Sequence, residues 1–187
     1  AVGVVNYDAI KLIENISTKN NLTEPIMEFG IYDDGLLYDN VDKKLFYFYH
    51  DVNRFDDLIM SDDCFDKFHS SEVVPNMDKE KFSNIVNKAK QYIHDGDIFQ
   101  VVLSRKFAFE TTGDNLTLYK TLRKLNPSPY MYHLKQDSKT IIGASPEMLV
   151  RITGDKVETF PIAGTRKITD NEEKNKALSV ELINDEK

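Results

Sequence analysis

The sequence contains little cysteine, and this excludes two kinds of site. Cys64 is the single cysteine among 187 residues, so no disulfide can form within the chain and a reducing compartment is expected. The four histidines are scattered, and with one cysteine they do not have the spacing of a zinc-ligand set. Histidine-based catalysis is likewise not indicated by their positions, which are His50, His69, His94 and His133.

Positive charge and long apolar runs are also scarce. The formal net charge is −7, and no basic stripe is present to neutralise the phosphates of a nucleic acid. No run approaches the roughly 18 consecutive apolar residues of a membrane span, and the first ten residues do not have the pattern of a signal peptide. The apolar fraction of 41% is ordinary for a globular chain. We therefore expect a cytoplasmic globular protein that binds neither nucleic acid nor membrane.

Local patterns in the first half predict short strands and one helix. Residues 2–5 form an apolar strand pattern, and residues 7–16 carry apolar side chains at helical spacing. Residues 25–32 and 35–38 are strand-like and are joined by a turn at residues 33–35. The aromatic segment 44–50 predicts a strand buried on at least one face. The polar and acidic stretch 51–78 indicates a linker or crossing, with room for a short helix.

Helix-cap and turn residues organise the second half. One helix is predicted from Asp78 to Gly96, followed directly by a strand at 98–109. A second helix is capped within residues 112–115 and stopped by the prolines after residue 125. Hairpins are predicted at 130–144 and, around Gly154 and Asp155, at 148–160. A last helix is capped by Thr169 or Asp170. Together these patterns predict an α+β fold of antiparallel strands with covering helices.

Two features near the second hairpin suggest a site. Glu147 follows Pro146, and a carboxyl group that donates a proton near neutrality needs burial or a nearby anion to raise its pKa. Residues 163–165 then offer Gly164, which lets a ligand approach the backbone, and the Thr165 hydroxyl. The alternative from spacing alone is a plain hairpin that carries an ordinary surface glutamate.

Four sequence motifs, in order, resemble those of the chorismate-utilising enzymes. They are IHDGDIFQVVLSRKF at 93–107, NPSPYMYHLK at 126–135, GASPEMLVR at 143–151 and PIAGTRK at 161–167. Within that family they resemble anthranilate synthase component I, and GVVNYDAIKLIE at 3–14 does so as well. The resemblance implies a portion of a larger α/β sandwich, with residues 1–77 in an N-terminal regulatory-type region and 78–187 in the first part of the catalytic domain. The last helix runs to residue 187 without a stop and the chain starts without Met, so a segment cut at both ends is expected.

The resemblance implies a carbon–oxygen lyase reaction. Ammonia adds to ring carbon 2 of chorismate, the ring hydroxyl leaves, and loss of pyruvate gives anthranilate. Glu147 matches the family's general acid, and its side chain is expected to lie close to that of Gln100 across a shared cleft. Gln100 matches the position that holds a lysine in members that add water, and it is predicted to share a strand face with Val102 and Ser104. Ala163 replaces the nucleophilic lysine of many aminodeoxychorismate synthases, which favours the anthranilate branch.

Further binding residues are implied in the same way. Gly164 and Thr165 match contacts to chorismate, whereas Arg166 is interpreted as a loop charge rather than a ligand. A tryptophan feedback site is implied, although the same residues also fit a plain helix stop that enters a hairpin. The residues that match this feedback site are Asn126, Pro127, Pro129, Tyr130 and Met131.

The resemblance also implies a cofactor and partners that lie outside the chain. Mg²⁺ is expected, with ligands outside this segment, and a glutamine amidotransferase subunit is expected to supply the ammonia. The isolated chain is therefore predicted to make no anthranilate, to expose apolar surface and to associate with itself. Two alternatives remain open, namely aminodeoxychorismate synthase component I and a non-catalytic module that binds tryptophan or chorismate.

Overall fold

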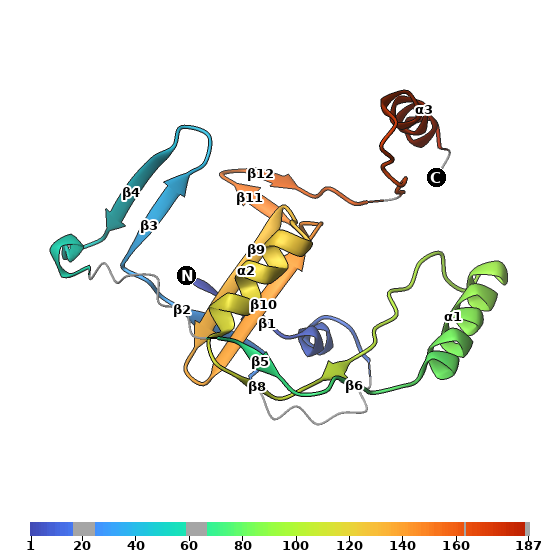
Figure 1. Cartoon of the computed structure of the whole chain (residues 1–187), viewed down its shortest axis with the longest axis horizontal. Helices are drawn as coiled ribbons and strands as arrows, with labels where there is room; N and C mark the ends of the chain where they lie inside the picture. The colour runs from blue at the N-terminus through green and yellow to red at the C-terminus, as the bar shows by residue number, and fades with distance from the viewer. Residues whose placement is uncertain (17–24, 59–66, 163, 186–187) are drawn as a thin grey trace. The chain divides into compact units, whose positions relative to one another are not determined.

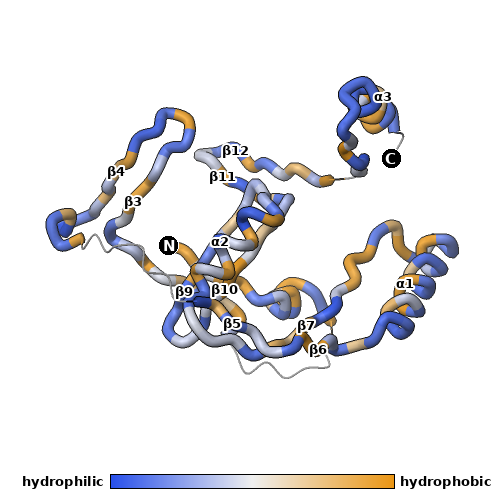
Figure 2. Tube along the Cα trace, in the orientation of Figure 1, coloured by the Kyte–Doolittle hydropathy of each residue, from blue (hydrophilic) through white to orange (hydrophobic). Residues whose placement is uncertain are grey.

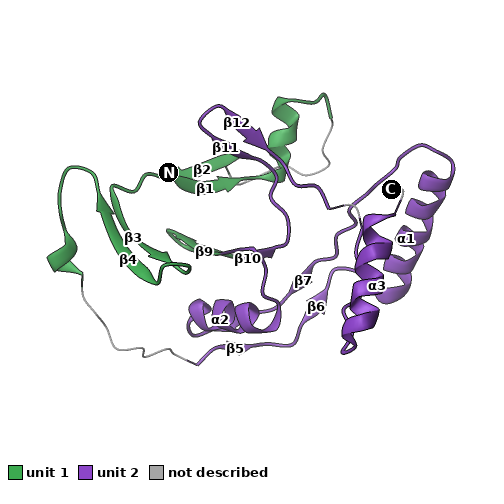
Figure 3. Cartoon of the chain, turned by 90° about the horizontal axis from the view of Figure 1, so that it is seen from above, with its two compact units in different colours: residues 1–64, 132–142 green, residues 65–131, 143–187 purple. Residues whose placement is uncertain are grey.

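The computed structural model describes residues 1–16, 25–58, 67–162 and 164–185 (Figure 1). Two compact units divide the chain (Figure 3). The first combines residues 1–64 with 132–142, and the second combines residues 65–131 with 143–187. No helix of the described residues is long and apolar enough to cross a membrane. The expected division into domains at residue 77 stays a prediction.

The first unit begins with a strand pair that is distant in sequence. Strand β1 (Val2–Val5) pairs antiparallel with β2 (Met27–Gly30). Between them, the helical pattern of residues 7–16 forms only a 3₁₀ helix, η1 (Tyr7–Leu12). The strand at 2–5 is therefore confirmed, and β2 falls within segment 25–32, which was predicted to be strand-like, with β1 as its partner.

A hairpin follows in the same unit. Strand β3 (Asp34–Asp39) pairs with β4 (Lys44–Tyr49). At its turn the Asp39 carboxylate accepts backbone hydrogen bonds from Val41 and Asp42. The predicted strand at 44–50 is confirmed, but its predicted burial is wrong, because within β4 only Tyr47 is half-buried and the other residues are exposed. A short 3₁₀ helix, η2 (Phe55–Asp57), lies in the predicted crossing.

The second unit is built around two capped helices. Helix α1 (Lys79–His94) starts at Asp78, whose carboxylate accepts a 2.7 Å hydrogen bond from the Lys81 amide. It ends before Gly96, which has a φ of +81° that favours glycine. Helix α2 (Asn115–Leu125) is capped by Asp114 in the same way. Both helices confirm the predictions made from their cap residues.

The strand predicted at 98–109 is largely wrong. Only β7 (Phe107–Ala108) is a strand, paired with β6 (Val74–Pro75). A second short pair joins β5 (His69–Ser70) to β8 (Thr111–Thr112). Residues 98–106 have an apolar composition that suits a strand, but they have no strand to pair with, so no ladder forms there.

The C-terminal part confirms both predicted hairpins. Strand β9 (Tyr130–Gln136) pairs with β10 (Lys139–Ser145), and β11 (Arg151–Thr153) pairs with β12 (Lys156–Glu158) across Gly154, at a φ of +58°. Helix α3 (Glu172–Ile183) is capped by Asn171 rather than by Thr169 or Asp170. The described sheets are antiparallel strand pairs accompanied by helices, which fits the predicted α+β class.

Candidate functional site

Glu147 lies in the turn between β10 and β11, within the second unit. The Ser145 hydroxyl donates a 2.8 Å hydrogen bond to the Glu147 carbonyl, so the serine side chain closes this turn. The Glu147 carboxylate oxygen Oε1 accepts a hydrogen bond from the backbone amide of Ile162 at 3.2 Å. This contact joins two segments that are 15 residues apart in sequence. It places the carboxylate next to the loop that contains Gly164.

The environment of Glu147 differs from the prediction. Its side chain and Pro146 are both exposed, so the described residues do not enclose the carboxylate in apolar surroundings. The apolar run after Glu147 does not cover it, because Leu149 is 89% exposed and turns to solvent. The burial that a general acid at Glu147 needs is therefore not provided by the described part of the chain.

The loop at 164–169 is attached to α3 through Arg166. The Arg166 guanidinium donates from Nε to the Glu181 carboxylate at 2.8 Å and from Nη2 to the Asp185 carboxylate at 2.8 Å. Its Nη1 also donates to the Thr165 carbonyl at 3.1 Å. The hydrogen bonds to Asp185 and Glu181 raise the pKa of Arg166 above its ordinary value. This geometry agrees with the interpretation that Arg166 is not a substrate ligand, but it adds a role that the sequence reasoning missed.

The first residues of this loop are open to solvent. Gly164 and Thr165 are exposed, and a Cβ atom added to Gly164 would lie 3.0 Å from Leu182 Cδ1 on α3. Thus the Gly164 backbone lies against the helix on one side and is open on the other. Ala163 lies outside the described residues, so its predicted role as a branch determinant stays a prediction.

Gln100 does not lie where the sequence predicted. It is exposed and sits in a segment without secondary structure, so the strand face shared with Val102 and Ser104 does not exist. Further along, Arg105 donates to the Met77 carbonyl at 3.0 Å, and the Lys106 amide donates to the Asn76 side chain. These contacts hold the segment to the residues before α1 instead of to a sheet. The proximity of Gln100 to Glu147 stays a prediction.

The candidate tryptophan site lies between α2 and β9. Asn126 ends α2, its amide donating to the Leu122 carbonyl at 2.8 Å. Pro127 and Pro129 are exposed, and Met131 is half-buried at the start of β9, after Tyr130. This local geometry is that of a helix stop that enters a hairpin. Tryptophan binding by these residues stays a prediction.

A metal site would need several His, Cys, Asp or Glu side chains close together. Within the described ranges, no group of three or more His, Cys, Asp or Glu side chains could hold a metal ion. A Mg²⁺ site needs about six oxygen ligands. The described residues therefore do not fit a resident Mg²⁺ ion, and the Mg²⁺ ion expected with ligands outside this segment stays a prediction.

Two polar clusters escaped the sequence reasoning. One is the set formed by Arg166, Glu181 and Asp185, and the other joins Asp34 to Tyr47 and Arg54 in the first unit. Glu181 and Asp185 are four residues apart at the end of the last predicted helix, and this spacing places both carboxylates on one side. From this spacing, a basic side chain bound to both carboxylates could have been predicted.

Comparisons with known proteins agree with the resemblance. The whole chain, residues 1–187, matches the family model described as chorismate binding enzyme. Anthranilate synthase component 1 of Saccharolobus solfataricus is 40% identical over 190 residues, which covers 100% of this chain and 44% of that protein. The protein of the same name from Acetivibrio thermocellus is 39% identical, again over 100% of this chain and 44% of its own length.

A solved structure shows the same fold over nearly the entire chain. The crystal structure of anthranilate synthase component I from Streptococcus pneumoniae superposes with a TM-score of 0.74 at 30% sequence identity. The superposition covers 99% of this chain and 45% of that one. The chain therefore spans less than half the length of the relatives that it matches.

Proposed function

The chain belongs to the chorismate-binding enzyme family, and we propose that it forms part of an anthranilate synthase component I. In this proposal the intact enzyme converts chorismate and ammonia to anthranilate and pyruvate, as a carbon–oxygen lyase of tryptophan biosynthesis. The ammonia comes from glutamine through an amidotransferase subunit. Mg²⁺, a cytoplasmic location and feedback inhibition by tryptophan at residues 126–131 belong to the same proposal.

The single observation that carries the proposal is the hydrogen bond between Glu147 and Ile162. The Ile162 amide donates to Glu147 Oε1 at 3.2 Å, and this bond joins the carboxylate of the 143–151 motif to the start of the 161–167 motif. The residues that follow Ile162 include Gly164 and Thr165, which the resemblance assigns to chorismate. One carboxyl group and one substrate-binding loop therefore adjoin each other, as a general acid and its substrate must.

The reaction gives each of these residues a task. The ring hydroxyl of chorismate is a poor leaving group, so Glu147 donates a proton to its oxygen as the C–O bond breaks. The Thr165 hydroxyl and the Gly164 backbone orient the substrate, which lowers the entropic cost of reaching the reacting geometry. Gln100 is a neutral amide at the position where members that add water carry a lysine, and it suffices because ammonia is already nucleophilic and needs no base.

The exposed position of Glu147 sets a requirement on the rest of the enzyme. A carboxyl group is protonated near neutrality only where burial or a neighbouring anion favours that form. Glu147 is exposed among the described residues. The bound chorismate, which carries carboxylates, and further segments of the relatives' length would supply both.

The first prediction is that Glu147→Gln abolishes anthranilate formation. The amide keeps the shape of the side chain but cannot donate a proton as an acid, so kcat should fall by about 10²–10⁴-fold. The measurement is anthranilate fluorescence from the intact polypeptide that contains this segment, with chorismate, an ammonium salt and Mg²⁺ added. Glu158→Gln is the matched control, because Glu158 is a half-buried ion-pair partner of Arg151 on β12 and its loss should leave kcat unchanged.

The outcomes separate the competing functions. Full activity in Glu147→Gln would overturn the assignment of the acid. If the wild-type product is an aminated chorismate that retains its pyruvyl group, the protein is an aminodeoxychorismate synthase. If no product forms but calorimetry detects binding of tryptophan or chorismate, a non-catalytic module is the better description.

A further inference from the structure

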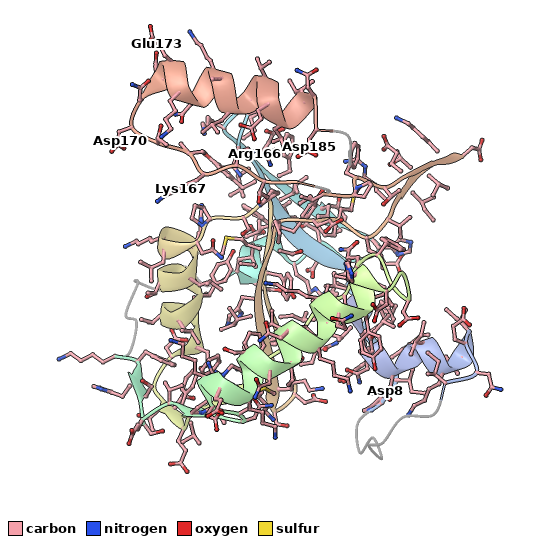
Figure 4. All side chains as sticks on the ribbon, turned by 90° about the vertical axis from the view of Figure 1, so that its right-hand side faces the viewer. Asp8, Arg166, Lys167, Asp170, Glu173 and Asp185 are labelled. Carbon is pink, nitrogen blue, oxygen red and sulfur yellow. The ribbon has the colours of Figure 1, made fainter. Side chains whose placement is uncertain are left out.

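We propose that helix α3 positions the chorismate-binding loop through Arg166, which makes Arg166 a positioning residue for the reaction. The effect on chorismate binding rests on the proposed function, whereas the attachment of the loop to α3 rests on the hydrogen bonds described below. All of the residues involved lie in the second compact unit. In Figure 4 the labelled Arg166 and Asp185 lie together at the C-terminal end of α3.

The first step is the pair of carboxylates that receives Arg166. Glu181 and Asp185 are one helical turn apart, at and just beyond the last turn of α3. Carboxylates near a helix C-terminus are unfavourable because they face the negative end of the helix dipole. The Arg166 guanidinium contacts both at 2.8 Å and is only 27% exposed. The positive charge of Arg166 therefore offsets the unfavourable interaction of Glu181 and Asp185 with the negative end of the helix dipole.

The second step is the attachment of the loop backbone to the same guanidinium. Arg166 Nη1 donates to the carbonyl of Thr165, its own preceding residue. The peptide unit between Thr165 and Arg166 is therefore oriented by a side chain that α3 holds. The close approach of Gly164 to Leu182, where a Cβ would lie at 3.0 Å, shows that the loop rests directly on the helix.

The third step is a second attachment at the other end of the loop. The Asn175 side chain of α3 accepts from the Thr169 amide at 2.9 Å and donates to the Thr169 carbonyl at 2.7 Å. It thereby satisfies both backbone groups of one loop residue. By contrast, Lys167 is exposed and takes no part in this set. Segment 166–169 is thus bound to α3 at both of its ends.

These contacts have a consequence for the residues between them and Glu147. Ile162 is held by the Glu147 carboxylate, and Arg166 is held by α3. Gly164 and Thr165 follow the first anchor and precede the second along the chain, and the resemblance assigns both to chorismate. Displacing Arg166 would therefore move the substrate contacts without removing the acid.

The experiment compares loop variants in the intact polypeptide. Arg166→Ala should accelerate hydrogen–deuterium exchange of backbone amides 164–169 at least tenfold. It should also raise KM for chorismate about tenfold while kcat changes less than threefold, and the pH profile of kcat should not move, because Glu147 remains. Arg166→Lys should be intermediate, since an ammonium cannot reach all three oxygens with a planar fork. Arg151→Ala, which breaks a comparable pair with Glu158, should change none of these quantities.

A double-mutant cycle tests whether Arg166 acts through α3. If it does, Asp185→Ala reproduces most of the effect of Arg166→Ala, and the double variant is no worse than Arg166→Ala. Additive effects on KM would instead mean that Arg166 contacts the substrate itself, which would overturn the proposal. If Arg166→Ala does not fold, Glu181→Gln and Asp185→Asn make the same comparison by milder changes. If the wild-type protein makes no anthranilate, the proposed function fails, and unchanged exchange in all variants would separately disprove the attachment.

Discussion

At the scale of single residues, the Asp34 carboxylate connects the side chains of Tyr47 and Arg54 in the first unit. Its carboxylate accepts a 2.8 Å hydrogen bond from the Tyr47 hydroxyl and a 2.9 Å bond from Arg54 Nε. The Arg54 amide in turn donates to the Tyr47 oxygen at 3.0 Å. These bonds, first from Tyr47 and then from Arg54, hold the pKa of Asp34 below its ordinary value. They fasten the chain after β4 back to the start of β3.

This cluster predicts a dependence of stability on pH. Because the folded-state pKa of Asp34 is depressed, its contribution is present above the unfolded-state pKa of about 3.9 and is lost as the pH falls through the folded value. Tyr47→Phe removes the largest cause, so the titration midpoint of the Asp34 carboxyl carbon, followed by NMR, should move up towards the ordinary aspartate value. Tyr38→Phe on the same strand pair is the control. An unchanged midpoint in Tyr47→Phe would contradict this account.

At the scale of elements, local capping accounts for the helices. The Asp78 carboxylate accepts from the Lys81 amide at 2.7 Å and so satisfies one of the free amides of the first turn of α1. Asp78→Ala should therefore lower the local stability of α1 by about 1 kcal/mol. Hydrogen exchange of the first-turn amides measures this directly. Asp78→Ser, which can still cap, should keep most of the protection, and equal loss in both variants would show that the cap is not responsible.

Elements specified by nearby residues could be predicted from the sequence, whereas elements that depend on distant partners could not. Helices α1 and α2 and the hairpin β11–β12 are specified by residues within a few positions of their ends, such as Asp78, Asp114 and Gly154. The pairing of β1 with β2 and of β6 with β7 depends on partners far away in sequence. Periodicity alone does not identify such partners. Consequently segment 98–109 was predicted as a strand although only β7 has a partner.

In the candidate site, likewise, some features could be predicted from the sequence and others could not. The motif residues Glu147 and Gly164 were found because residue type and order carry the resemblance. Their surroundings were not, since exposure of Glu147 depends on which segments pack over it. The attachment of Arg166 to α3 was also missed, because it joins side chains 15 and 19 residues apart. Residue identity was thus predictable, whereas burial and side-chain partners required the fold.

At the scale of the whole molecule, apolar surface is the dominant feature. Ala89 is the one buried hydrophobic residue of the described part of the chain. Hairpin β3–β4 has apolar residues on both faces, and Figure 2 marks hydrophobic positions along the tube of both strands. One face has Leu37, Phe46 and Phe48, which are 47–59% exposed, and the opposite face also has exposed apolar residues, namely Leu36, Tyr38, Leu45 and Tyr49.

Such a hairpin is suited to lie between two other layers. A two-stranded hairpin alone is marginally stable in water, and exposed apolar patches of this kind mark surfaces that bind other protein. The relatives are more than twice as long as the matched region. We therefore expect the 187-residue chain, taken alone, to associate with itself, as the sequence predicted, and to make no anthranilate.

Light scattering after size-exclusion chromatography tests this expectation over a range of concentrations. The apparent mass should rise with concentration, and a dye that reports exposed apolar surface should bind. Leu37→Thr with Phe46→Thr removes apolar area from one face of the hairpin and introduces a β-branched residue that suits a strand, so it should lower both the mass and the dye signal. Val41→Thr, at the 89% exposed turn position outside both faces, should change neither. A chain that stays monomeric at high micromolar concentration and binds no dye would show that these faces are covered within the molecule, and the double variant would then unfold it instead of dispersing it.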